Sequence, residues 1–98
     1  MPEAKFKLGQ VVATPGALQA LEDAGQSPDH FLDLHQNGSW GELDESDRRL
    51  NDRAVAQEGD PDHQGRVFSR YLTCKGAKLY VITEWDRSVT TLLLPEDY

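Results

Sequence analysis

A polar loop divides this 98-residue chain into two halves with different sequence patterns. The loop is QEGDPDHQG, residues 57–65, in which glycine, proline and acidic residues leave no apolar run. From about residue 14 to 57, apolar residues recur with helical spacing, whereas β-branched and aromatic residues dominate from about 66 to 94. This order predicts an α+β fold in which short N-terminal helices pack on one face of a C-terminal antiparallel sheet.

The helical half carries start signals for three short helices. In TPGALQALEDAG, Thr14 can cap a helix whose first residue is Pro15, and Gly25 follows the end of the helix. SPDHFLDLHQNG repeats this arrangement from Ser27 onwards. Asp44 can cap a third helix, with acidic residues in its first turn where the helix dipole favours them.

The predicted third helix has a thin apolar face. Leu50 and Ala54 form this face, together with one of the two residues that follow Ala54. Because most of its other residues are charged, we expect this helix to lie on the surface. Asp44 and Arg48 are one turn apart and are expected to attract each other.

Three segments of the second half read as strands, namely RVFSRYLT, AKLYVITEW and SVTTLLL. The links between them are short enough for hairpins, and Pro95 ends the last strand. Residues 5–13, KFKLGQVVA, predict a further extended segment that can join an edge of the sheet, with Gly9 at a bulge. The expectation is therefore one domain, residues 1–98, with a three- or four-stranded meander.

The charge is unevenly distributed along the chain. Seventeen acidic and ten basic residues give a formal net charge of −7, and residues 42–62 contribute eight acids against three arginines. This balance argues against direct binding to nucleic acid, which requires cations to replace the phosphate counterions. It fits either a solubilising surface or a surface that docks a basic protein partner.

Neither a membrane segment nor an export signal is apparent in the sequence. No stretch approaches the roughly 18 consecutive apolar residues of a membrane-spanning helix, and the first residues lack the pattern of a signal peptide. The single cysteine, Cys74, excludes an internal disulfide and a cysteine-based metal cluster. We therefore expect a cytoplasmic protein without membrane contact.

The residues that could carry chemistry are scattered. His30 and His35 are five residues apart, on different faces of a helix, so we expect His30 in solvent and His35 partly packed. His63 stands among acids whose spacing does not match a calcium loop. The sequence therefore predicts no metal, no cofactor and no enzymatic activity, unless the fold gathers histidine and carboxylate side chains in a cleft.

Interaction surfaces are the remaining functional candidates. Trp40 lies between two glycines and is interpreted as a buried plug before the third helix, with an exposed contact residue as the alternative. Trp85, in the turn EWDRS, is the better contact candidate, and cross-strand packing is the alternative. The candidate interaction residues are Trp85, Arg87, Asp47, Asp52, Glu58 and Trp40.

The stretches KLGQVVATPGALQALEDAG, HQNGSWGELDESDRRLND and KLYVITEWDRSVTTLLLPEDY resemble a group of small proteins carried by plasmids, phages and integrated mobile elements. Such proteins are labelled "plasmid-related protein" or "type I restriction endonuclease subunit M". The resemblance covers nearly the whole chain, except the loop around residues 57–65. A catalytic methylase is excluded, because the chain has no Pro-Pro pair for a flipped-base pocket and no G-x-G-x-x-G turn.

Our leading hypothesis is a small acidic, non-enzymatic binding protein. The resemblance implies a partner among host defence or nucleic-acid-processing proteins, which the chain could modulate or inhibit. One alternative is a structural or self-associating module, in which an exposed edge among the C-terminal strands pairs two copies as a homodimer. A small enzyme with an unrecognised site is the other alternative.

Overall fold

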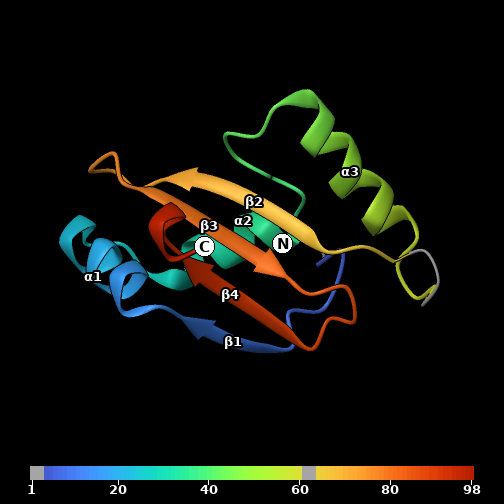
Figure 1. Ribbon diagram of the computed structural model, residues 1–98, viewed down its shortest axis with the longest axis horizontal. Helices are drawn as coiled ribbons and strands as arrows, with labels where there is room; N and C mark the ends of the chain where they lie inside the picture. The colour runs from blue at the N-terminus through green and yellow to red at the C-terminus, as the bar shows by residue number, and fades with distance from the viewer. Residues whose placement is uncertain (1–3, 61–63) are drawn as a thin grey trace.

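Four strands form one mixed sheet, and the helices lie on one face and at one edge of it (Figure 1). The computed structural model describes residues 4–60 and 64–98. The elements in chain order are β1 (Gln10–Ala13), α1 (Pro15–Ala24), α2 (Pro28–Gln36), α3 (Glu45–Ala56), β2 (Val67–Leu72), β3 (Lys78–Thr83), β4 (Val89–Leu93) and a closing 3-10 turn, η1 (Pro95–Asp97). The predicted α+β class is confirmed.

The sheet has the strand order β1-β4-β3-β2. β2, β3 and β4 form the predicted antiparallel meander, and β1 joins β4 as a parallel edge strand. The extended N-terminal segment thus reaches the sheet as expected, but only four of its residues form a strand. Gly9 precedes that strand with a φ of 66°, and a Cβ there would lie 2.4 Å from the carbonyl oxygens of Arg87 and Ser88. Its role is this close approach to the β3–β4 turn.

The helix starts follow the predicted capping pattern. The side chains of Thr14, Ser27 and Asp44 each accept a hydrogen bond from a backbone N–H in the first turn of their helix. Pro15 and Pro28 open α1 and α2, because the missing N–H of proline costs nothing at that position. These local bonds determine where each helix begins.

Two apolar clusters fill the space between the helices and the sheet. Figure 1 shows α2 behind the sheet, α1 beyond the left-hand ends of its strands and α3 beside β2. The larger cluster joins α1 and α2 to the sheet through Ala17, Leu21, Phe31, Leu32, Tyr71, Leu79, Val81 and Leu92. The smaller one lies under α3 and the N-terminal segment, and contains Phe6, Trp40, Leu43, Ala54 and Val67. Burial of this apolar surface is the main driving force for folding.

α3 uses a different face from the one expected. Leu50 is 61% exposed, whereas Asn51 is buried together with Ala54. The Asn51 amide donates to the carbonyl oxygen of Phe68 at 2.6 Å, and its oxygen accepts from the Phe68 N–H at 3.0 Å. The side chain thus pairs with the edge of β2 as a neighbouring strand would. The prediction for Leu50 was wrong because an apolar pattern gives no weight to a buried amide.

The charged side chains of α3 also pair differently from the prediction. Arg48 donates to the backbone carbonyl oxygens of Leu43 and Gly41, both at 3.0 Å, rather than to Asp44. The one-turn ion pair joins Glu45 and Arg49 at 2.7 Å. Since both partners of that pair are highly exposed, it contributes little to stability.

A substitution of Gly41 can test the close contact between the segment before α3 and β2. Gly41 has a φ of 79°, and a Cβ on it would lie 2.1 Å from the carbonyl oxygen of Arg70. Gly76 has a similar φ of 81° but no atom within 4 Å of the added Cβ. We expect Gly76→Ala to lower the free energy of unfolding by about 1–2 kcal/mol, from backbone strain alone. Gly41→Ala adds the steric clash and should cost roughly 3 kcal/mol or more in urea denaturation. Equal losses in the two variants would contradict the close contact.

Candidate functional site

The turn between β3 and β4, residues 84–88, is held in one conformation by local hydrogen bonds. Arg87 has a φ of 59°, a left-handed conformation that is uncommon outside glycine. The Asp86 carboxylate accepts from the backbone N–H of Ser88 at 3.1 Å and from its hydroxyl at 2.6 Å. These bonds lower the pKa of Asp86 because they stabilise its charged form.

The side chain of Arg87 is buried beside this turn and holds it in place. It forms a 2.7 Å ion pair with Glu58, just beyond the end of α3. The same guanidinium donates to the carbonyl oxygens of Gly65, Glu84 and Trp85 at 2.7, 3.0 and 3.3 Å. Arg87 is only 8% exposed, so its predicted role as a contact residue is corrected: it positions the turn from inside.

Trp85 is presented by the turn to solvent. Its residue surface is 54% exposed, while its carbonyl oxygen accepts from Gln64 at 2.5 Å as well as from Arg87. The backbone is therefore fixed and the indole remains accessible. Glu84 and Asp86, the residues on either side, are also exposed, which gives the tryptophan an acidic surrounding.

Trp40 lies in the interior, which confirms its interpretation as a plug. It is 6% exposed, and its ring stacks on Phe6 with a centroid distance of 6.3 Å. Its indole N–H donates to a carboxylate oxygen of Asp52 at 3.1 Å. Trp40 is thus not available as a contact residue, and Asp52 has a structural partner.

The three predicted docking acids are in different situations. Glu58 is partly buried and neutralises Arg87. Asp52 is exposed but holds Trp40. Asp47 lies partly buried at a groove of about 260 Å³ between α3 and β2. The structure does not bring the three together as one acidic face, because two of them anchor buried side chains.

A buried histidine, His35, forms a polar network that the sequence only hinted at. Its Nδ1 lies 2.5 Å from the Ser69 hydroxyl and its Nε2 lies 3.0 Å from the Thr83 hydroxyl. The Thr83 and Thr90 hydroxyls are 2.7 Å apart, so the network joins α2 to three strands. Burial and, to a lesser extent, the charge of Arg87 lower the pKa of His35 to about 3. The ring is neutral and closed to solvent, which suits a structural role better than acid–base catalysis.

The other candidates give no site among the described residues. His30 and Cys74 are exposed, and His63 lies outside the described residues. Within residues 4–60 and 64–98, no group of three histidine, cysteine or acidic side chains is placed to hold a metal ion. In the same part of the chain, no helix is both long enough and apolar enough to cross a membrane.

Comparison of the chain with protein-family models, with curated proteins and with solved structures gives no match. The feature with functional potential is the exposed Trp85 on a backbone that buried groups hold in place.

The His35 network predicts a specific dependence of stability on pH. The folded-state pKa is about 3 and the ordinary value is 6.5, so only the unfolded chain binds this proton between these values. Stability should therefore fall as the pH is lowered through this window, by about 1.4 kcal/mol per pH unit from His35. The free energy of unfolding, measured by urea denaturation from about pH 6 to about pH 4.5, should change less steeply with pH for His35→Gln than for the wild type. His30→Gln, at an exposed position, should keep the wild-type slope; equal slopes in all three proteins would contradict this account.

Proposed function

We propose that this chain is a non-enzymatic binding protein that engages a protein partner through the turn at residues 84–88. The observation that carries the proposal is the half-exposed Trp85 on a backbone fixed by Arg87. Tryptophan is enriched among the residues that dominate binding energy at protein interfaces. A turn that is already ordered loses little conformational entropy when it binds.

The charge around the turn suggests a basic partner. Exposed Glu84 and Asp86 flank Trp85, and the chain as a whole carries a net charge of −7. The turn lies beside the C-terminal end of α3, as the ion pair between Arg87 and Glu58 requires (Figure 1). Complementary charge speeds the encounter of two proteins and selects against acidic competitors.

We infer that the partner is a host defence protein or another protein that processes nucleic acid. Such proteins have basic grooves for phosphate groups, and carboxylates can occupy the same positions. The resemblance of the chain to proteins of mobile elements supports this class, because an element gains from restraining host defence. A partner of this kind places the chain in the cytoplasm.

The proposal predicts that Trp85 is required for capture of the partner. The tagged wild-type chain, incubated with lysate of a plausible host, should retain a basic nucleic-acid-binding protein at low salt and release it at high salt. Trp85→Ala should reduce the retained amount by roughly tenfold or more. Leu18→Ala, an exposed position on α1, is the matched control and should bind as the wild type does. Equal retention by Trp85→Ala and the wild type would refute the role given to the turn.

A further inference from the structure

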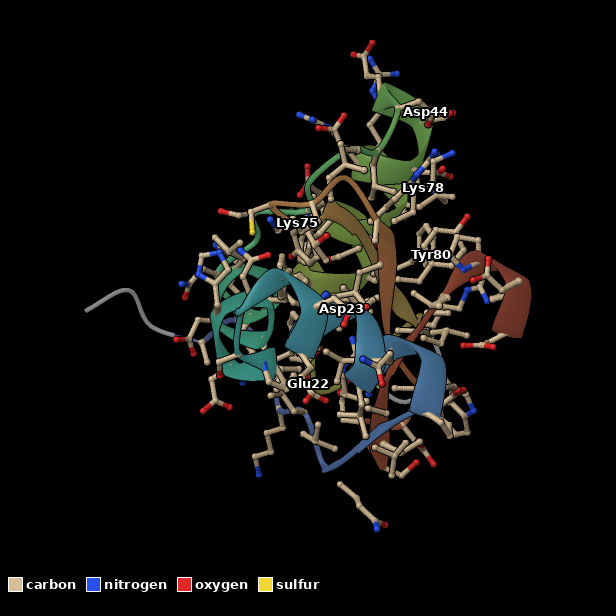
Figure 2. All side chains as sticks on the ribbon, turned by 90° about the vertical axis from the view of Figure 1, so that its left-hand side faces the viewer. Glu22, Asp23, Asp44, Lys75, Lys78 and Tyr80 are labelled. Atoms are coloured by element: carbon tan, nitrogen blue, oxygen red, sulfur yellow. The ribbon has the colours of Figure 1, made fainter. Side chains whose placement is uncertain are left out.

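The sheet has a second face, which α1, α2 and α3 leave uncovered and which η1 covers in part, so that Ile82 and Leu93 are buried there. Alternate residues of the strands point to this side, among them Phe68 and Arg70 of β2 and Tyr80 of β3. Figure 1 looks onto this face, with η1 in front of it, and Figure 2 shows Lys78 and Tyr80 projecting from the sheet on the same side. We call this surface the open face.

An aromatic cluster occupies the middle of the open face. The Phe68 and Tyr80 rings lie 5.0 Å apart between centroids, and Tyr80 and Tyr98 lie 6.3 Å apart. Tyr98 is 68% exposed. Exposed Leu50 continues the apolar surface across the groove beside Phe68. Contiguous apolar surface of this kind on a folded chain marks a site of association.

The edges of the sheet are poorly suited to pairing with another strand. At the outer edge of β2, the Arg70 N–H donates to Trp40 and its carbonyl oxygen accepts from Glu42. Asn51 occupies both backbone groups of Phe68 on the same strand. The expected pairing of two copies through an edge of the C-terminal strands therefore does not fit. The opposite edge strand, β1, has only four residues, a length that limits edge-to-edge association.

The charges on the open face are self-complementary. Arg70 and Lys78 lie on its β2–β3 side, while Arg66, just before β2, donates to the Tyr98 hydroxyl at 2.9 Å. The acids Glu96 and Asp97 belong to η1, which follows β4 and whose residue Asp97 bonds to Thr14 next to β1. A two-fold axis parallel to the strands would place the basic side of one copy over the acidic side of the other. Two-fold interfaces require this kind of self-complementarity.

We propose that two copies of this chain associate through their open faces, with Tyr80 at the centre of the interface. Stacked sheets pack with their side chains interdigitated, and the aromatic cluster supplies the apolar core that such an interface needs. The proposal goes beyond the protein-binding function, because its interface is centred on Tyr80 of β3 and not on Trp85 of the turn.

Sedimentation velocity over a dilution series tests the proposal. The wild type should shift from dimer to monomer on dilution, and Tyr80→Glu should raise the dissociation constant of the dimer by roughly tenfold or more. Leu18→Glu, on the exposed side of α1, should leave the dissociation constant unchanged. A wild type that stays monomeric at every concentration would overturn the proposal, as would a Tyr80→Glu variant that dimerises normally.

Charge reversal tests the geometry without altering the aromatic cluster. Arg70→Glu and Glu96→Lys should each weaken self-association, because each variant places like charges opposite each other in a symmetric pair. An equimolar mixture of the two should form more dimer than either alone, since both contacts in the mixed pair have opposite charges. No gain on mixing would overturn the proposed orientation. Partner capture by the Arg70→Glu variant should remain, which separates this test from that of Trp85.

Discussion

The buried guanidinium of Arg87 is the interaction on which the presentation of Trp85 depends. A buried charge is tolerated only when it is paired and its donors are satisfied, and here Glu58 supplies the opposite charge. The Nη1 group of the guanidinium donates instead to three backbone carbonyl oxygens. Because those oxygens belong to the segment before β2 and to the β3–β4 turn, one side chain joins parts of the chain that are distant in sequence. The backbone that carries the exposed indole is thus held by a buried side chain.

Two further polar groups specify how the layers pack. His35 holds α2 against three strands through hydroxyl groups, and Asn51 holds α3 against the edge of β2. Apolar contacts alone would permit several arrangements of short helices on a sheet. A satisfied buried polar group favours the single arrangement in which all its bonds are made. Arg87 is a further polar group in contact with the core, since its guanidinium carbon lies 5.5 Å from the centre of the Phe6 ring.

Much of the fold could be predicted from the sequence because its signals are local. Caps such as Thr14 and Asp44 act within one turn of their own helix, and the hairpin links act between neighbouring strands. Leu50 was assigned to the wrong face, and the burial of Asn51 was not predicted, because apolar periodicity gives no weight to a buried amide. For Arg87, the sequence indicated a turn but could not reveal Glu58, which lies 29 residues away, as its partner. His35 stood on the apolar stripe of its helix, and that position was the one signal of its burial.

The candidate site, like the fold, could be predicted from the sequence only in part. The exposure of Trp85 followed from its place in a short turn, and the burial of Trp40 followed from its flanking glycines. The acidic residues were harder to interpret, because a carboxylate on a helix looks the same in sequence whether it faces solvent or a buried donor. Asp52 and Glu58 have such donors in Trp40 and Arg87. Only tertiary structure distinguishes a docking carboxylate from an anchoring one.

The most direct test of the central claim is amide hydrogen exchange at residues 84–88 in Glu58→Gln, followed by NMR. If the ion pair fixes the turn, the amide of Arg87, which donates to the Glu84 carbonyl oxygen, should exchange faster in this variant than in the wild type. Amides in the middle of β3 should keep their protection. Glu45→Gln, which removes the exposed ion pair of α3, should leave the turn unchanged. Wild-type exchange at the turn in Glu58→Gln would contradict the account.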